Sequence, residues 1–493
     1  MSGDLLVRSA RIAGPGRELL PTDEPVDILI RSGVIADIAP AGILKVTADV
    51  LDAQGTWVVP GLWDHHVHTV QWALDAQRLP LGEASSAAEA ARLISGASPL
   101  PDDRVVGTGF RDGLWPDRPT RALLDAASGE RPTYLINADV HSVWLNSAAL
   151  RREGFDGFDD DGLLREEDAF EISRRLNAAD DAVVDAAVDA AGARAAARGI
   201  TGLVDFDMAW NADAWRRRVA RGFDSHRVEF AFYRADLQRA IREGLRSGDE
   251  LGETNGLVRV GALKLITDGS LGTRTAACSH AYADDPQNFG VLTIEPDELR
   301  DLLMIAAGSG LDVAVHAIGD RAVSHALDAF TYTQARGTIE HAQLVRHADL
   351  MRFARLGVVA SVQPEHAVDD RDMAADLWRD QQAIGHPLAT LLAAGIPVRF
   401  GSDAPVAPLD PWLTISAAVH RTHDDRDAWH PEERVSPETA LRASSRHGDA
   451  TIALGTTADL ALCGMDPLTA DREELRSMPV VATILGGRVT HRG

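Results

Sequence analysis

The sequence has few cysteines, few basic residues for its size and no long hydrophobic run, and each shortage excludes a class of protein. Cys278 and Cys463, the two cysteines among 493 residues, stand far apart and form no CxxC motif. A disulfide framework and a cysteine metal cluster are therefore excluded, and we expect a reducing, cytoplasmic location. No run of 18 apolar residues could span a bilayer, and the N-terminus lacks the apolar region of a signal peptide.

Basic residues number 49 against 74 acidic ones, which gives a net charge of −25. Such a surface repels phosphate backbones and anionic lipid, so we expect neither nucleic acid nor a membrane as a partner. The charge favours a small neutral or cationic molecule as substrate. The sequence leaves open whether the chain assembles as a homo-oligomer.

The composition is that of a folded protein, with 45% hydrophobic and 25% charged residues. The length predicts about three domains, or fewer if one is a large α/β barrel. Short strands and turns fill residues 5–58, and the stretch 459–493 has the same texture. We therefore expect residues 1–58 and 430–493 to form one composite β-sandwich built from both ends of the chain.

Between these ends, short apolar strands alternate with helical stretches, a pattern typical of a parallel sheet. Eight such strands can be found, in stretches 56–69, 201–207, 227–233, 260–269, 311–320, 337–343, 358–364 and 397–405. Eight is the number that closes a TIM barrel. The sequence predicts an α/β protein with a distorted (β/α)8 barrel over residues 59–71 and 191–429.

The spacing of the strands is uneven, because about 120 residues separate the first from the second. We expect an insertion domain at residues 72–190. It contains the strand-like pieces RVVGTGF and PTYLINADV and an acidic loop, FDGFDDDG at residues 155–162, that misses the spacing of a calcium site. We interpret that loop as a solvated one.

The strongest chemical signal is the motif Asp64-His65-His66-Val67-His68 at the end of an apolar strand. Alternation along a strand points His66 and His68 the same way, with Cβ atoms roughly 6 to 7 Å apart, which one metal ion can bridge. Asp64 points to the same side of the strand, two residues before His66, and we expect it to support the strand. In a chain with 17 histidines the motif alone leaves chance occurrence open.

Three further strand ends favour a metal centre. His316, His341 and Asp403 each follow an apolar strand, at the mouth where TIM barrels place their reactive groups. Packing alone accounts poorly for so many imidazole and carboxylate groups at matching positions. Lys264 lies inside an otherwise apolar strand, where a buried ammonium is costly. It either pairs with Asp268, extends to solvent, or captures CO2 as a neutral amine to give a carbamate that bridges two cations.

The motifs PGLWDHHVH, KLITDGSLGTR, HAIGD, IEHAQ, SVQP and GSDAP occur in this order. Together with residues 107–125, 139–150 and 162–170, they resemble the metal-dependent amidohydrolase superfamily, and specifically its N-substituted formamide deformylase-like (YtcJ-like) branch. The resemblance covers nearly the whole chain. It implies a distorted barrel beside a composite β-sandwich and hydrolysis of an amide, formamide or cyclic amide C–N bond in a small molecule.

The resemblance also implies a zinc site. His66, His68 and Asp403 would hold one ion, His316 and His341 a second, and carboxylated Lys264 would bridge them. Water bound between two cations is acidic enough to ionise near neutral pH, and Asp403 would carry its proton to the leaving nitrogen. Iron, manganese and nickel suit these ligands nearly as well as zinc.

Other positions give weaker signals. The resemblance implies that His141, in the insertion, hydrogen-bonds the substrate, and the alternative is an ordinary surface histidine. Trp115, Arg274, Asp320, Gln363 and His366 lie in or near loops at the expected mouth. Asp320 and Gln363 could also orient ligands or simply form structural hydrogen bonds. The chain differs from the branch pattern at Phe110-Arg111, at Val140 and at Phe206-Asp207. These differences concern the substrate and leave the predicted metal ligands unchanged.

Two alternatives remain from the sequence. A mononuclear deaminase-type site would use His66, His68, His316 and Asp403, with His341 orienting the water. Lys264 speaks against it, because such a site has no need of a bridging lysine. A barrel relative without catalytic activity is the other alternative, but such proteins usually lose ligands first and all six positions are filled here.

Overall fold

The computed structural model describes residues 3–14, 24–100, 102–155, 161–178 and 180–493. Most of the acidic loop at 155–162 lies outside them. An eight-stranded parallel sheet forms the centre of the molecule, and its strands are adjacent in chain order. They are β6 (Leu62–Val67), β12 (Ile200–Asp205), β13 (Arg227–Tyr233), β14 (Val258–Ile266), β15 (Val313–Ala317), β16 (Gly337–His341), β18 (Val359–Val362) and β20 (Val398–Phe400). All eight predicted strands are present.

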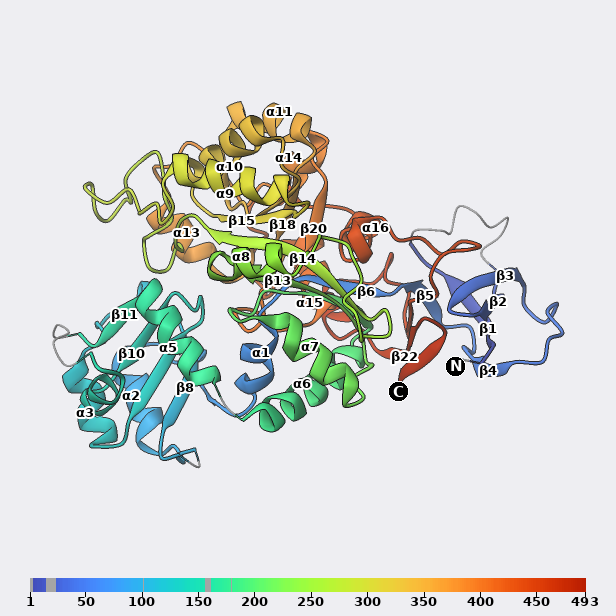
Figure 1. Ribbon diagram of the computed structural model, residues 1–493, viewed down its shortest axis with the longest axis horizontal. Helices are drawn as coiled ribbons and strands as arrows, with labels where there is room; N and C mark the ends of the chain where they lie inside the picture. The colour runs from blue at the N-terminus through green and yellow to red at the C-terminus, as the bar shows by residue number, and fades with distance from the viewer. Residues whose placement is uncertain (1–2, 15–23, 101, 156–160, 179) are drawn as a thin grey trace.

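The sheet closes where its two edge strands meet. Val67, at the end of β6, pairs in parallel with Ala404, just after β20. Helices cover the outside of the barrel, as Figure 1 shows for α9 and α10. They are α1 (Thr69–Asp75), α6 (Asp181–Ala196), α7 (Asn211–Ala220), α8 (Leu237–Arg242), α9 (Pro296–Gly308), α10 (Asp320–Thr333), α11 (His347–Leu356), α14 (Leu388–Ala393) and α15 (Pro411–His420). The strand faces and helix faces share one large hydrophobic core, so the predicted distorted TIM barrel is confirmed.

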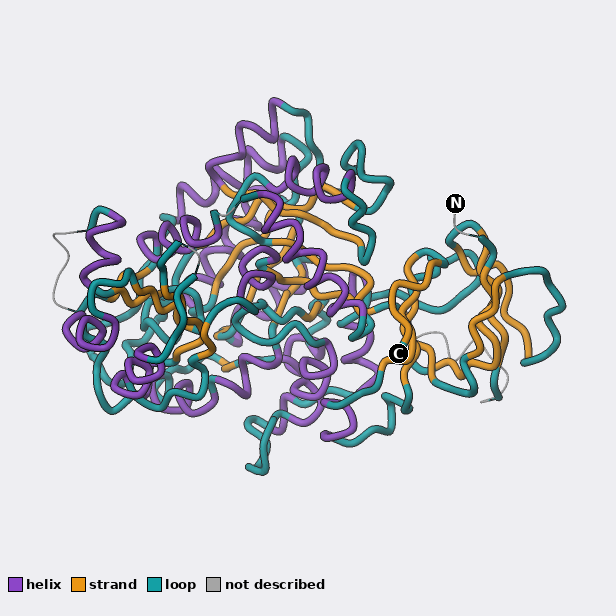
Figure 2. Tube along the Cα trace, turned by 90° about the horizontal axis from the view of Figure 1, so that it is seen from below, coloured by secondary structure: helices purple, strands orange, loops and turns teal. Residues whose placement is uncertain are grey.

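Strands from both ends of the chain form a separate sheet, on the right in Figures 1 and 2. Its order is β23-β22-β21-β5-β1-β2-β3, with β4 paired to β1. The strands are β1 (Leu5–Ile12), β2 (Val26–Arg31), β3 (Val34–Pro40), β4 (Asp49–Asp52), β5 (Trp57–Pro60), β21 (Leu460–Cys463), β22 (Val480–Leu485) and β23 (Arg488–Arg492). N-terminal Val58 and C-terminal Leu462 are partners in the β5–β21 pairing and share one apolar core.

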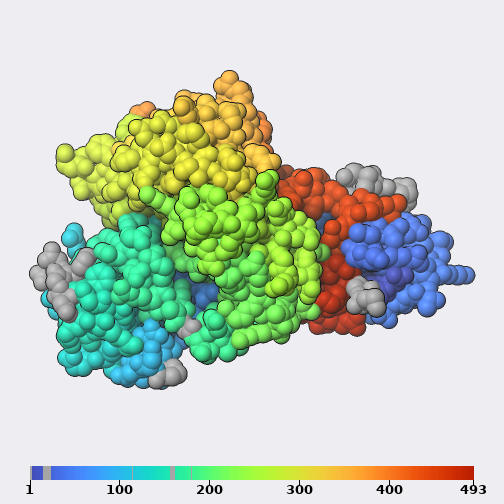
Figure 3. Space-filling model, in the orientation of Figure 1, coloured from blue at the N-terminus to red at the C-terminus, as the bar shows by residue number. Residues whose placement is uncertain are grey.

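A third sheet lies between β6 and β12 in the chain and forms the teal lobe of Figure 1. Its strands are β7 (Leu79–Pro80), β8 (Val105–Phe110), β9 (Thr133–Asn137), β10 (Ser142–Leu145) and β11 (Leu163–Arg165). The helices α2 (Ala87–Ser95), α3 (Arg121–Ser128), α4 (Ser147–Glu153) and α5 (Glu167–Asn177) belong to this lobe. Figure 3 shows the lobe lying against the barrel. The next helix, α6, packs against α1 and β12 and so covers the barrel itself.

The remaining helices follow the later strands. Two short ones, α12 (Pro364–Asp369) and α13 (Arg371–Leu377), follow β18, and α16 (Pro437–Ala443) and α17 (Arg472–Arg476) lead into the terminal sheet. The short strands β17 (Leu344–Val345) and β19 (Ile384–Gly385) pair with each other. None of the described helices is long and apolar enough to cross a membrane.

Candidate metal centre and substrate cavity

One cavity of about 190 Å³ lies at the carboxyl ends of the barrel strands. Its walls include all six side chains that the sequence predicts as metal ligands: His66, His68, Lys264, His316, His341 and Asp403. They come together because the carboxyl ends of parallel strands meet at the same end of a barrel. All six are buried.

The junction of β6 and β20 fixes the position of Asp403. A Cβ on Gly401 would lie 2.6 Å from the backbone nitrogen of His66, so this close approach requires glycine. The Asp403 amide donates to the carbonyl of His66 at 2.8 Å. Asp64 accepts from the backbone of Ser402 at 2.9 Å and so supports the same junction.

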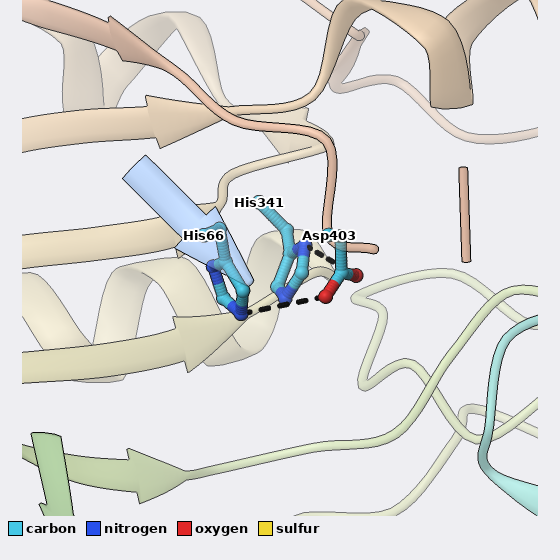
Figure 4. A group of neighbouring side chains, drawn as sticks. All are labelled: His66, His341 and Asp403. Carbon is cyan, nitrogen blue, oxygen red and sulfur yellow. Dashed lines mark ion pairs between the residues drawn. The ribbon is translucent and has the colours of Figure 1, made fainter. Parts of the chain in front are cut away.

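His66, His68 and Asp403 face one another across a short gap (Figure 4 shows His66 and Asp403). Asp403 Oδ1 lies 3.5 Å from His66 Nε2 and 3.3 Å from His68 Nε2. The opposite ring nitrogen of His66, Nδ1, lies 2.7 Å from the buried Glu340 carboxylate and donates to it. This hydrogen bond places the proton of neutral His66 on Nδ1, so the Nε2 lone pair faces the Asp403 oxygen.

Burial keeps these imidazoles neutral. It is the largest cause of lowering for His66, His316 and His341, whose pKa values all lie well below the ordinary value. Neighbouring cations add to the effect, namely Lys264 for His66 and His341 and His141 for His316. Neutral imidazole is the form that binds a metal ion.

Lys264 is 2% exposed and its Nζ lies 3.3 Å from His66 Nε2 and 4.4 Å from the centre of the Phe206 ring. Among the described residues it forms no ion pair within 4 Å. Asp268 is occupied by backbone amides of Ala277, Ile318 and Gly319. Burial lowers the pKa of Lys264 to about 8, against the opposing effect of Glu340 and Asp403. Neither pairing with Asp268 nor extension to solvent therefore describes this lysine.

The other two histidines extend the group. The ring centres of His316 and His341 are 4.5 Å apart, and His341 Nδ1 donates to Gln363 Oε1 at 2.8 Å. His341 and Asp403 have positive φ angles of 74° and 61°, a conformation that non-glycine residues rarely adopt. Strained backbone of this kind concentrates at functional sites.

The residues present fit a metal ion. Asp403 Oδ1 is buried and has no hydrogen-bond partner among the described residues. An imidazole lone pair and a carboxylate oxygen repel each other at 3.5 Å unless a cation lies between them. Ligand atoms of His66, His341 and Asp403 all lie within 4.8 Å of one another. A second group of this kind, Glu365, Asp369 and His423, is already paired with arginines, Glu365 with Arg476 and Asp369 with Arg111.

The predicted substrate-contacting residues have different positions. His141 lines the cavity and pairs with Glu166, with Nδ1 and Oε2 2.9 Å apart, and this carboxylate helps to raise its pKa to about 9 despite burial. Trp115, Arg274, Asp320 and Gln363 are not among the described residues that line the cavity.

Each of these four has another partner. Trp115 donates to the Ala84 carbonyl at 3.0 Å, and Arg274 pairs with Asp284 at 2.8 Å. Asp320 accepts from the Ser279 amide at 2.7 Å, and Gln363 holds His341. These contacts are structural or orient a ligand, so we propose no direct substrate contact for the four.

Two further residues of the site, Glu340 and His366, have no function predicted from the sequence. Glu340 lies next to His341 in the chain, and the alternation of side chains along a strand would point the two in opposite directions. His366 Nε2 lies 3.8 Å from Asp403 Oδ2, and the His366 ring is nearly parallel to that of His341. An acidic residue beside a predicted histidine ligand was the available signal for Glu340.

A barrel that brings four imidazoles, a lysine and a carboxylate to one cavity has the arrangement of a candidate metal centre. The profile of the amidohydrolase family matches residues 49–491, so the chain belongs to this family. It is therefore a hydrolase of carbon–nitrogen bonds other than peptide bonds, as the sequence predicted. The predicted branch is confirmed as well.

Known proteins resemble the chain over most of its length. The protein LONG AFTER FAR-RED 3 of Arabidopsis thaliana is 28% identical, over 98% of this chain and 91% of that protein. An N-substituted formamide deformylase of Arthrobacter pascens is 26% identical, over 93% and 94%. An uncharacterized metal-dependent hydrolase from Pyrococcus horikoshii has the same fold, with a TM-score of 0.79 and 24% identity over 95% of this chain and 99% of that one.

Proposed function

We propose that this protein hydrolyses the C–N bond of a small amide, formamide or cyclic amide with two divalent metal ions, normally zinc. The observation that carries the proposal is the buried contact between His66 Nε2 and Asp403 Oδ1, two acceptors that need a cation between them. Similarity to the Arthrobacter deformylase supports the formamide class. When bound, such ions lower the pKa of water and polarise a substrate carbonyl.

Each side chain of the group has a proposed role. His66, His68 and Asp403 would hold one ion, and His316 and His341 the other. Glu340 and Gln363 fix the rings of His66 and His341 by accepting hydrogen bonds from their Nδ1 atoms. His141, held by Glu166, would donate a hydrogen bond to the substrate.

Lys264 would bridge the two ions as a carbamate. Its neutral amine nitrogen forms a bond to the carbon of CO2, and one proton is released. Burial supports this step, because a pKa of about 8 leaves a substantial neutral fraction near neutral pH. A mononuclear deaminase-type site has no use for such a lysine at its centre, so the burial of Lys264 among the histidines supports the proposal of two ions.

Asp403 would move the proton. Its Oδ1 faces His66 and His68, while Oδ2 lies 4.0 Å from His341 Nδ1 and 3.8 Å from His366 Nε2. We assign the proton of the hydrolytic water to Oδ2, from which it passes to the leaving nitrogen as the C–N bond breaks. The products are a carboxylic acid and an amine, which remain joined in one molecule when the amide is cyclic. A carboxylate that lines the cavity beside the histidines supports this role in general acid–base catalysis.

We also propose a cellular location and a class of partner for this protein. Both cysteines are buried and free, and the net charge is −25. These features support a cytoplasmic enzyme with a small-molecule substrate and no nucleic-acid partner.

The test is product analysis on the metal-loaded protein. N-substituted formamides, simple amides and cyclic amides are incubated with it, and acid and amine are quantified. Equal amounts of the two products, lost in Asp403→Asn, are expected. Release of ammonia from aminated heterocycles, with none of the amide classes cleaved, would support the deaminase alternative and contradict the proposal.

A further inference from the structure

The cavity that contains the histidine group is also lined by several acidic side chains. Apart from Asp403, its lining includes five carboxylates and one guanidinium: Asp112, Asp139, Asp369, Asp370, Asp372 and Arg111. The insertion supplies Asp112, Asp139 and Arg111, and α12 and α13 with the residue between them supply the others. Any substrate that reaches the histidines occupies the space between these groups.

Arg111 and the carboxylates of α12 and α13 largely satisfy one another. Arg111 Nη1 lies 3.2 Å from Asp370, and its Nη2 lies 3.2 Å from Asp369. Asp372 pairs with Arg426 at 2.7 Å. The positive charge of His141 is likewise matched by Glu166. Apart from Lys264, which the proposed metal centre would engage, these pairs leave no cation without an ion-pair partner among the described residues that line the cavity.

Asp112 and Asp139 form no ion pair with any described residue. Asp112 Oδ1 accepts from the Asn137 amide at 2.8 Å, and Asp139 accepts from the His141 amide at 3.0 Å and from Ser270 Oγ at 2.6 Å. All these donors are neutral, and the nearest positive charges, Arg165 for Asp112 and His141 for Asp139, form no ion pair with them. Burial and then the charge of Asp139 raise the pKa of Asp112, the direction expected when like charges lack a cation.

A second, independent feature of the cavity indicates that its ligand carries N–H groups. Gln343 lines the cavity and is 5% exposed, and its Oε1 has no hydrogen-bond partner among the described residues. Its amide nitrogen lies 3.5 Å from His366 Nδ1, which leaves the carbonyl oxygen as a buried acceptor. A buried acceptor without a donor is costly, and an N–H of a bound ligand would satisfy it.

We propose that the substrate carries a primary or secondary ammonium group, which Asp112 and Asp139 bind while the scissile amide or formamide lies at the histidine group. This inference rests on the proposed function and adds the substrate class: N-acylated or N-formylated amines with a second, cationic nitrogen. A neutral tail leaves the two carboxylates without a cation. A carboxylate tail is repelled.

The test uses formamides that differ in one terminal group. N-formyl-1,5-diaminopentane ends in an ammonium, N-formylhexylamine replaces that ammonium with a methyl group of nearly the same size, and 6-formamidohexanoate ends in a carboxylate. Homologues with three to six methylenes cover the unknown span. With the metal-loaded enzyme at low salt, the best ammonium substrate should exceed its methyl counterpart in kcat/KM by at least about tenfold, the scale of one charge-assisted hydrogen bond. The carboxylate series should be the poorest.

The double variant Asp112→Asn/Asp139→Asn should remove this preference. Asparagine keeps one acceptor oxygen, for Asn137 at position 112 and for His141 at position 139, and its amide nitrogen can donate to Ser270 Oγ in place of the second Asp139 oxygen. The methyl substrate has no charge for these two residues to bind, so its kcat/KM should change by no more than a few-fold, which checks that the cavity is intact. The matched control is Asp297→Asn/Asp301→Asn on α9, where both side chains are largely exposed. It changes the net charge equally and should leave the preference unchanged.

A binding measurement separates this inference from the proposed function. Calorimetric Kd values of the same formamides for Asp403→Asn require no turnover, so they report on charge selection even if no formamide is hydrolysed. Tighter binding of the ammonium series, lost when the Asp112 and Asp139 substitutions are added, supports the inference. Equal Kd values for ammonium and methyl tails, or a preference for the carboxylate tail, would overturn it.

Discussion

His66 Nδ1 donates a hydrogen bond to Glu340 Oε2 across 2.7 Å, and both side chains are 1% exposed. This contact joins the first strand of the barrel to β16. It fixes which nitrogen of His66 faces Asp403, and it does so with a group that the cavity does not expose to substrate. Glu340 is therefore a positioning residue for the proposed metal centre.

Glu340→Gln should weaken metal binding by about 10- to 100-fold, the usual effect of losing a carboxylate partner of a ligating histidine. Glutamine retains an acceptor oxygen, so the fold should survive. Metal Kd from competition with a chelator measures the effect, and the thermal midpoint of the metal-free protein serves as the control. A Kd equal to that of the wild type would show that Glu340 has no influence on the site.

Asp403→Asn should reduce kcat by about 10²- to 10⁴-fold, because the proposed proton carrier is lost. The structural role of Asp403 comes from its backbone amide, which the substitution keeps. Circular dichroism and the thermal midpoint should therefore change little. Near-normal turnover in this variant would contradict the assignment.

Lys264→Gln should lower the metal content by about one ion per chain, since it cannot form a carbamate. A short carboxylate such as propionate supplies two oxygens and should restore part of the content and activity. In the wild type, metal loading with bicarbonate should become faster as the pH rises through about 8, because the amine is protonated below its pKa and cannot capture CO2. No response to bicarbonate or to propionate would argue against the bridge.

His226 predicts a pH dependence of stability away from the site. Both ring nitrogens lack partners among the described residues, and burial lowers its pKa to about 3. The unfolded value is near 6.5, so between these values the unfolded chain binds more protons and acid favours unfolding. From pH 7 to pH 4.5 this group should cost about 2 to 3 kcal/mol of stability.

His226→Leu removes that term. Its thermal midpoint relative to the wild type should therefore rise progressively as the pH falls from 7 to 4.5. His347→Leu changes an exposed histidine and provides the matched control. A gap between His226→Leu and wild type that stays constant over this pH range would mean that His226 does not resist protonation in the folded state.

The sequence predicted the strands and the common end at which their polar groups gather, because both follow from local patterns and from the geometry of parallel sheets. It could not predict the contact of Glu340 with His66, which joins residues 274 positions apart. Regular alternation along β16 would also place the side chains of Glu340 and His341 on opposite faces of the strand. The positive φ of His341 interrupts this alternation. Backbone strain of this kind has no signature in a single sequence.

The roles of residues in the loops at the barrel mouth were harder to predict from the sequence. Trp115 and Arg274 have the chemistry of substrate-binding residues, but their partners Ala84 and Asp284 become visible only in the folded chain. Asp112 and Asp139 look like ordinary surface acids in the sequence. Their proposed role rests on the lack of an ion-pair partner among the described residues, which depends on where every neighbouring loop lies.

The most direct test of the central claim is the metal content per chain, measured by elemental analysis on protein purified without chelator and with bicarbonate. We predict about two ions in the wild type, about one in Lys264→Gln, and no change in His423→Asn, which removes the second candidate group. A wild type with one ion that Lys264→Gln retains, or with none after loading, would contradict a binuclear centre bridged by Lys264.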